Sequence, residues 1–344
     1  MTTQTTPTLR IAVLADGDHV QRWQRNALAA LDAEPGVEIS TVVVNERQTD
    51  VDDDHGPLTF LRGAADRFRT YPLWSLVGVG RLLTPDLHGG QPVPLASVGD
   101  LSEAEWVACT PQSVDEYWNT LPDHAVAALS DVDVAVRFGF GMLKGEALSA
   151  PTHGVLSYHL GDIREYRGQP GGFWEFLHGD AEMGVTVQRL TETLDGGEIA
   201  ALERVDIGDT DTFREVRAAA YRTAETMLVP AVRTLTDDKR SVDRPDRIGT
   251  LYTMPEGRDV LRYALKDTRG YIAAADVPVS RATGTRAVAL LTAGAAITGV
   301  RTVLSDESGD GLHTEQLVGL LLVAVSLALL LDDGDSPPRR WRSV

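Results

Sequence analysis

The order of the first apolar runs constrains the fold of this 344-residue chain most strongly. Arg10 to Ala15 is a short run rich in branched side chains, and Val20 to Leu31 has the spacing of an amphipathic helix. A second run, Val37 to Val44, follows the turn at Pro35-Gly36. Strand, helix and strand in this order predict neighbouring parallel strands. We therefore expect an α/β fold with a mainly parallel sheet.

Two later runs, Asp133 to Phe138 and Val155 to His159, are typical of buried strands. Ligands of open α/β sheets gather at the carboxyl ends of the strands, so His159 lies where chemistry is expected. Between the early and late strands, only Leu58 to Phe68 has a helical pattern.

The chain becomes helical after residue 210. Asp211 to Leu235 has apolar residues at the spacing of one helix face, and Asp209, Thr210 or Asp211 could cap its start. Asp237 to Arg247 is charged and irregular, as at a boundary. A further amphipathic helix is expected over Arg258 to Ile272, before a second boundary at Pro278.

The tail contains two apolar runs, Ala287 to Leu304 and Leu317 to Leu331, separated by the acidic loop SDESGDG. A membrane-spanning helix needs about 20 apolar residues, so both runs are short, but the second is uniformly hydrophobic. We predict a two-helix membrane hairpin. The alternative is a buried helical pair that docks on the preceding domain or dimerises. Arginines on both flanks would keep both ends cytoplasmic: Arg281, Arg286, Arg339, Arg340 and Arg342.

These patterns divide the chain into four parts. Residues 1–240 form the main domain, 241–282 a helical linker, 283–334 the two-helix transmembrane hairpin and 335–344 a polar tail. The expected location is the cell membrane, multi-pass, with the main domain in the cytoplasm. The first residues, MTTQTTPTLR, lack an apolar stretch, so no signal peptide is expected.

The charge of the chain is strongly acidic, with 50 Asp and Glu against 32 Lys and Arg and a net charge of -18. Only 3 of the 32 basic residues are Lys. Dense carboxylates with little Lys are typical of halophilic proteins, and the alternative is an ordinary acidic cytosolic protein. The negative field argues against a nucleic-acid partner, because a phosphate backbone needs a basic face.

The single cysteine, Cys109, excludes an internal disulfide and a CxxC metal site. A small core residue is the expected role of this side chain. His153, His178 and the other histidines lack metal-ligand spacing with acidic or thiol partners, so no metal is predicted.

The segment from Pro151 to Ala200 carries the chemistry. His159 follows an apolar run, and Asp195 lies 36 residues later in a Leu-Asp-Gly-Gly turn, with an Arg-Gly loop and a Gly-Val-Thr strand between them. This order resembles the folate-dependent formyltransferases, which include the methionyl-tRNA, glycinamide ribonucleotide and amino-sugar enzymes. In that family the phrases are NxHxSLLPxYRG and a Leu-Asp-Thr-Gly turn after GVTxxxx.

One residue departs from the family, because Ser157 stands where the family has Asn. The phrases SYHLGD, YRGQP and GGFWE nevertheless resemble members that read SFHHGD before a YRG loop and a PxGFWE segment. The resemblance covers roughly residues 131–207 and does not reach the tail. It implies a Rossmann-like formyltransferase fold, here followed by a helical carboxyl-terminal tail.

The resemblance also implies an activity: a one-carbon transferase that moves a formyl group from 10-formyltetrahydrofolate, as co-substrate, to a small-molecule amine. An amino sugar used for surface glycan synthesis is the expected acceptor, and a homodimer is allowed. Two alternatives remain open. One is a non-catalytic, membrane-tethered module that binds folate or sugar, and the other is a formyl-folate hydrolase.

Roles for the catalytic residues follow from the same resemblance. His159 would face the oxyanion of the tetrahedral intermediate, Asp195 would orient His159 and relay the amine proton, and Ser157 would replace the Asn donor. Residues 157 and 159 alternate with Tyr158, so both side chains leave one face of a strand. A hydroxyl is shorter than an amide, which places the donor farther from the oxyanion.

Two loops are the expected binding segments. The loop FGFGMLK resembles the folate-contacting loop of the family, with Phe138, Gly139, Gly141 and Leu143 as contacts. The loop REYRGQPGGFW would bind substrate through Arg167, Gly168 and Trp174, with Arg167 against a phosphate or carboxylate. The alternative for Arg167 is a structural pair with a neighbouring acid.

Overall fold

The structure is a computed structural model that describes residues 8–46, 88–99, 101, 103–114, 117–237 and 239–274. It contains two compact units: one ends at Met254, and the other includes the helix α9 (Gly257–Ala274).

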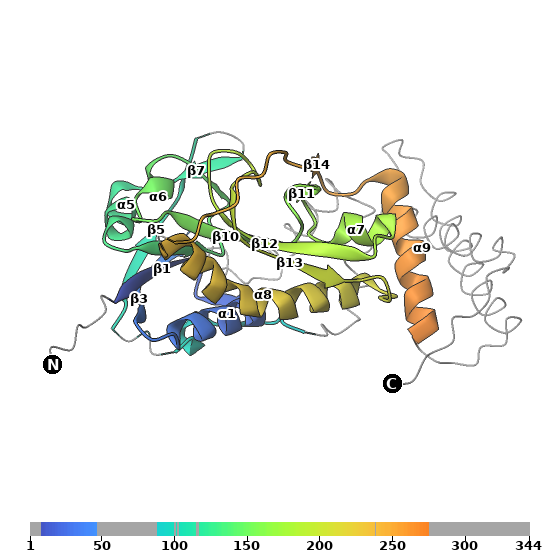
Figure 1. The fold of residues 1–344 in the computed structure, drawn as a ribbon, viewed down its shortest axis with the longest axis horizontal. Coiled ribbons are helices and arrows are strands. Elements are labelled where there is room, and N and C mark those ends of the chain that lie inside the picture. Colours follow the sequence, from blue (N-terminus) through green and yellow to red (C-terminus); the bar gives the residue numbers. More distant parts are fainter. Residues whose placement is uncertain are drawn as a thin grey trace, which may run out of the picture. The chain divides into compact units, whose positions relative to one another are not determined.

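The first unit is built on a seven-stranded sheet in the order β13-β12-β10-β8-β1-β3-β5. The strands from β10 to β5 run parallel, whereas β12 and β13 are antiparallel additions at one edge. The expected mainly parallel α/β sheet is therefore confirmed (Figure 1). In sheet order the strands are Glu198–Asp206, Glu182–Arg189, Val155–His159, Val134–Arg137, Leu9–Asp16, Val37–Asn45 and Glu105–Cys109.

Central strands are apolar because helices cover both faces of the sheet. In β1, the five residues from Ile11 to Ala15 have no exposed surface. On one face, α5 (Asp123–Ser130) and α6 (Glu146–Ser149) contribute Leu129 and Ala147 to a core that includes Leu14 and Val155. The expected core position of Cys109 is confirmed in the same cluster.

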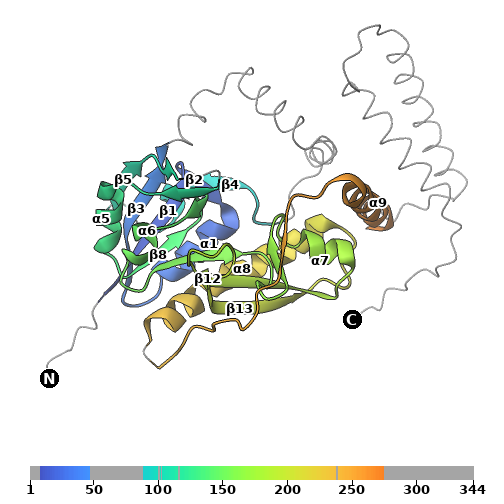
Figure 2. The same cartoon turned by 90° about the horizontal axis from the view of Figure 1, so that it is seen from above.

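The other face is covered by α1 (Arg22–Asp32) and α8 (Phe213–Thr236), which lie side by side in both views (Figures 1 and 2). The Trp23 and Tyr221 rings stack between these helices at 5.5 Å. Tyr158 of β10 points to this face, since its hydroxyl donates to the Ala224 carbonyl at 2.8 Å.

The long helix α8 begins at Phe213, two residues after the predicted start at Asp211. Its cap is Thr212, not Asp209, Thr210 or Asp211. The Thr212 hydroxyl accepts from the Glu215 N–H at 3.3 Å, and the Glu215 carboxylate accepts from the Thr212 N–H at 2.9 Å. This reciprocal capping box satisfies two N–H groups that a lone aspartate could not both reach.

Short elements complete the first unit around the main sheet. Three small sheets are also present. In two of them β2 pairs with β4 and β11 pairs with β14, and the third has the strand order β6-β7-β9. The pairing of β14 with β11 joins a segment after residue 240 to the first unit. The elements are β2 His19–Gln21, β4 Pro92–Pro94, η1 Leu95–Ser97, β6 Gln112–Ser113, β7 Trp118–Thr120, β9 Met142–Leu143, β11 Tyr166–Gly168, α7 Phe173–His178 and β14 Thr250–Tyr252.

Several expectations lie outside the described residues: the helix over Leu58 to Phe68, the boundary at Pro278, the hairpin 283–334 and the tail 335–344. Within the part of the chain that the structure describes, no helix has the length and apolar character needed to cross a membrane.

Candidate active site at the carboxyl ends of β1, β8 and β10

The register of the parallel strands brings four polar side chains to one face of the sheet. Ser157 lies opposite Arg137 across β10 and β8, and Arg137 lies opposite Leu14 across β8 and β1. Because side chains alternate along a strand, Asp16 shares the face of Leu14, and His159 shares that of Ser157. All four residues lie at or near the carboxyl ends of their strands, where ligands of α/β sheets bind.

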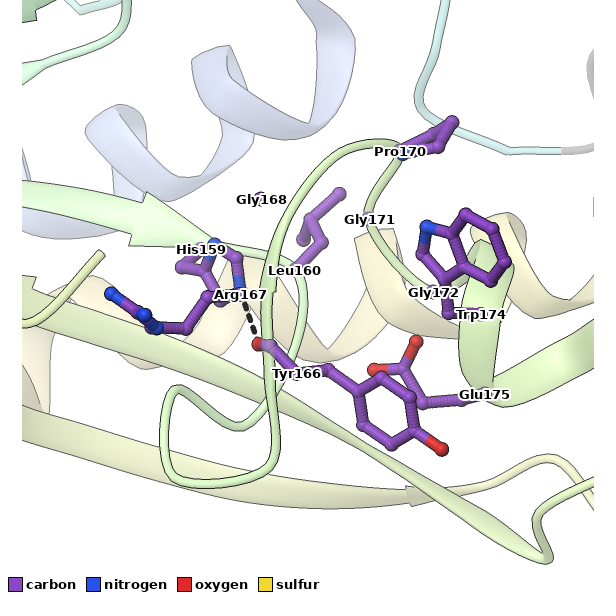
Figure 3. Close-up of a pocket in the computed structure, with 10 residues that line it drawn as sticks. All are labelled: His159, Leu160, Tyr166, Arg167, Gly168, Pro170, Gly171, Gly172, Trp174 and Glu175. Carbon is purple, nitrogen blue, oxygen red and sulfur yellow. Dashed lines mark hydrogen bonds between the residues drawn. The ribbon is translucent and has the colours of Figure 1, made fainter. Parts of the chain in front are cut away.

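His159 is held on both sides of its ring. Its Nε2 lies 2.9 Å from the Tyr166 carbonyl oxygen, and its Nδ1 lies 3.6 Å from Asp195 Oδ1. A carbonyl oxygen only accepts, so Nε2 carries the hydrogen in the first contact (Figure 3). The side chain is only 8% exposed, so its orientation is fixed by these contacts.

Asp195 reaches His159 from a tight turn after β12. Its φ of 42° lies in the left-handed region, which aspartate tolerates better than most residues. The Gly168 N–H donates to Asp195 Oδ2 at 2.9 Å. One carboxylate oxygen is thus fixed by backbone, and the other faces the imidazole.

Arg167 braces the same turn. Its Nη1 donates to the Leu194 carbonyl and its Nε to the Gly249 carbonyl, each at 2.8 Å. We expected this guanidinium to face a substrate phosphate or carboxylate, or to pair with a neighbouring acid. Both acceptors are backbone carbonyls, so in this structure Arg167 positions the loop that carries Asp195.

Gly168 and Trp174 also lie beside the site. Gly168 has a φ of 89°, and a Cβ there would lie 1.9 Å from the Tyr252 carbonyl oxygen, so only glycine fits. The Trp174 ring stacks on Tyr252 at 4.9 Å and donates through Nε1 to the Gln169 carbonyl at 3.1 Å. The loop expected to bind substrate therefore has a rigid aromatic wall.

Ser157 is buried against a guanidinium. Its Oγ accepts from Arg137 Nη2 at 2.9 Å and from Nε at 3.3 Å, and Ser157 is only 2% exposed. The Nη1 of Arg137 donates to the carbonyls of Gly139 and Gly141. Burial lowers the pKa of Arg137, and the charges of Asp195 and Asp16 act in the opposite direction.

The loop expected to contact folate starts at the end of β8. Phe138 turns to the opposite face of the sheet, where its ring lies 6.0 Å from both Trp23 and Tyr158. Leu143 is a core residue at 2% exposure. At Phe138 and Leu143, therefore, only the backbone can contact a ligand.

The glycines of this loop permit close approach. A Cβ on Gly139 would lie 2.5 Å from the Asp16 backbone N, and Gly141 has a φ of 61°. Asp16 fixes the loop between them, because its Oδ1 accepts from the Phe140 N–H at 2.8 Å and from Asn45 Nδ2 at 2.7 Å. The loop conformation is thus determined by β1 and β3.

A pocket opens between His159 and α7 (Figure 3). Glu175 of α7 is 3% exposed and its Oε1 has no hydrogen-bond partner among the described residues. Burial, with Asp180, Glu165 and Asp162 nearby, raises the pKa of Glu175 to about 7. Ten residues line the pocket: His159, Leu160, Tyr166, Arg167, Gly168, Pro170, Gly171, Gly172, Trp174 and Glu175.

Sequence reasoning missed Arg137 and Glu175. Each is a single charge in an otherwise apolar phrase, VAVRFGF and GGFWEFL respectively. An isolated charge in a buried strand or helix is a signal, because such groups are costly to bury without a partner.

The comparisons with known proteins match the segment that contains this site. The Formyl transferase family profile matches residues 112–232, which include β8, β10, the pocket loop and Asp195. The methionyl-tRNA formyltransferase of Rhodopseudomonas palustris (strain BisB5) is 31% identical over 123 residues, or 36% of this chain and 40% of the relative. That of Ralstonia pickettii (strain 12J) is 30% identical over 144 residues, or 42% and 41%.

A solved structure, glycinamide ribonucleotide transformylase 1 from Symbiobacterium toebii, shares 18% identity and a TM-score of 0.40, covering 71% of this chain and 95% of that one. The chain spans about two fifths of the length of the two curated relatives. Residues 112–232 therefore carry a formyl transferase domain, with the residue order that resembles the folate-dependent formyltransferases.

Proposed function

We propose that this protein transfers a formyl group from 10-formyltetrahydrofolate to a small-molecule amine. The observation that carries the proposal is His159, held between the Tyr166 carbonyl and Asp195 at the carboxyl end of β10 and facing a pocket. The segment that forms this arrangement lies within the family match.

The reaction needs charge stabilisation and proton movement. The amine nitrogen attacks the formyl carbon, and a tetrahedral intermediate with an oxyanion forms. The carbon–nitrogen bond to folate then breaks, the amine loses a proton and the folate nitrogen gains one. In this proposal the Nε2–H of His159 exchanges the Tyr166 carbonyl for the oxyanion when substrate binds, and Ser157 is the second donor. Asp195 holds the imidazole and relays the proton.

Glu175 supports an amine as acceptor. A buried carboxyl oxygen such as Oε1, without a hydrogen-bond partner among the described residues, is costly unless a ligand satisfies it. An amine or ammonium group in the pocket would donate to its Oε1. With a pKa near 7, the same carboxyl can bind the protonated amine and accept a proton from it.

The finer proposal is that the acceptor is a nucleotide-linked amino sugar. The aromatic wall of Tyr166, Trp174 and Tyr252 offers flat faces against which a sugar ring can pack. The net charge of -18 disfavours transfer RNA. The apolar runs 287–304 and 317–331 support the further proposal that transfer takes place at the cytoplasmic side of a membrane, on a precursor of surface glycan.

The test is a transfer assay on the full chain in high salt. Release of tetrahydrofolate from 10-formyltetrahydrofolate is followed across nucleotide-linked amino sugars, glycinamide ribonucleotide and methionyl-tRNA, and formylated product is identified by mass. Release that depends on one amine supports transfer and names the acceptor.

Two outcomes would contradict the proposal. Formate released without any acceptor would indicate a formyl-folate hydrolase, and folate binding without release would indicate a binding module. His124→Ala is the matched control for His159→Ala, because the His124 ring also contacts a backbone carbonyl, that of Ala108, on an exposed surface.

A further inference from the structure

Ser157 stands where the family it resembles has Asn, and the structure shows what accompanies this change. Arg137, its direct neighbour across β8 and β10, places two guanidinium nitrogens on the Ser157 oxygen. The site therefore contains a cation in contact with the residue expected to donate to the oxyanion.

We propose that Arg137 is a positioning residue that acts through Ser157, and that the two side chains together do the work of a single amide donor. Arg137 fixes the Ser157 hydroxyl and adds a positive charge behind it. This inference rests on the proposed formyl transfer and deepens it, because it assigns the oxyanion donor of that reaction.

The hydrogen-bond inventory determines the direction in which Ser157 donates. A serine oxygen has two lone pairs and one O–H, whereas a guanidinium only donates. With Nη2 at 2.9 Å and Nε at 3.3 Å, Arg137 occupies the acceptor side of the oxygen. The Ser157 O–H is left to donate elsewhere, and His159 is the next side chain on the same face of β10.

The charge of Arg137 is not neutralised by direct contact. Its acceptors in the described part of the chain are the Ser157 hydroxyl and the carbonyls of Gly139 and Gly141, all of them neutral. The acids Asp195 and Asp16 act on it only through space. A positive charge held in place before the reaction stabilises negative charge that appears during it, without further reorganisation.

The contact also strengthens the hydroxyl as a donor. Hydrogen bonds in a chain polarise one another, and a charged donor behind the oxygen makes its O–H more acidic. Because Ser157 is only 2% exposed, water does not screen this effect. Arg137 thereby offsets the short reach of serine, since its charge acts at longer range than the hydroxyl.

Steady-state kinetics on the full chain test the inference. Arg137→Met and Ser157→Ala should each lower kcat about 100-fold, the effect of losing one oxyanion donor, with little change in KM for the folate. If the two side chains act as a unit, the double variant should be only about threefold worse than either single variant. If Arg137 were purely structural, the losses in kcat of the two single variants would instead multiply in the double variant.

Two further variants separate positioning from folding. Arg137→Lys keeps the positive charge but loses the paired guanidinium donors, and it should be more active than Arg137→Met. Ser157→Asn should recover activity in the Arg137→Ala background but not beside Arg137, whose guanidinium fills the space. Arg189→Met is the matched control, since Arg189 lies on the neighbouring strand β12 with its own partner, Glu198.

Infrared spectroscopy gives a readout without turnover. The formyl carbonyl of 5-formyltetrahydrofolate, labelled with carbon-13 and bound to the full chain, should absorb at lower frequency in wild type than in Arg137→Met. Equal frequencies, or a kcat for Arg137→Met within threefold of wild type, would overturn the inference alone. Failure of the wild type to bind the labelled folate would remove the proposed function and this inference with it.

Discussion

Two buried carboxyl groups on the pocket side of the molecule have opposite environments. Asp162 is 2% exposed and Glu175 is 3% exposed. Asp162 accepts from Arg164 at 2.9 Å and from Arg204 at 3.2 Å, and these bonds hold its pKa below the usual value despite burial. Glu175 has no partner for its Oε1 among the described residues, and its pKa rises to about 7.

The difference shows that burial alone does not determine the state of an acid. A carboxylate with arginine partners contributes to folding, whereas one without a partner costs folding energy and is available to a ligand. Asp162 is therefore assigned to the scaffold and Glu175 to the pocket.

Replacing the paired acid should have the largest effect on stability. Asp162→Ala leaves Arg164 and Arg204 without their buried acceptor and should lower the free energy of unfolding by about 3 kcal/mol, measured by urea denaturation at pH 7. Since the folded pKa is lowered, the contribution of Asp162 is present above the unfolded pKa and is lost as pH falls through the folded value. A loss below 1 kcal/mol would contradict the scaffold role.

Replacing the unpaired acid should stabilise the protein at high pH. The folded pKa of Glu175 is raised, so its contribution is most favourable below the unfolded pKa of about 4.5 and is lost as pH rises through about 7. Glu175→Gln should therefore raise the free energy of unfolding by about 2 kcal/mol at pH 8 and change it little at pH 4. A uniform effect across pH would show that Glu175 does not titrate in this range.

The same titration should appear in catalysis. If ionised Glu175 binds the acceptor amine, KM for the amine should rise about fivefold as pH falls from 7 to 6, while KM for the folate stays constant. In Glu175→Gln this pH dependence should disappear. Glu165→Gln is the control, because Glu165 is nearby but exposed at 44%.

The exposed partner of Asp162 should have the smallest effect. Arg204 is 46% exposed, and solvent weakens its ion pair, so Arg204→Gln should cost at most about 1 kcal/mol. Arg164, which makes two side-chain bonds to Asp162, remains in place. A loss as large as that of Asp162→Ala would mean that Arg204 is the main partner of the buried acid.

The sequence predicted the parallel sheet because β1, β3, β8 and β10 are apolar runs separated by helices or loops, and local pattern alone decides such strands. It also predicted α8, whose apolar spacing matches residues buried in the structure. The cap at Thr212 was missed because Glu215 completes it, and that contact depends on geometry within the turn.

The site was less predictable than the fold. The phrase around His159 pointed to the strand end, but the partner of Ser157 lies 20 residues away on another strand. Register between strands, which sets this contact, is fixed by the packing of the whole sheet and is absent from any local phrase. Arg167 has the chemistry to bind a substrate phosphate or carboxylate, but its guanidinium donates to two backbone carbonyls of the protein.

The central claim is formyl transfer at His159, and its most direct measurement is the rate of tetrahydrofolate release. Wild-type chain and His124→Ala should release tetrahydrofolate from 10-formyltetrahydrofolate at similar rates when the acceptor amine is present, with one formylated amine formed for each folate released. His159→Ala should reduce this rate at least 100-fold while still binding the folate. Undiminished release in His159→Ala, or release without formylated amine, would contradict the account.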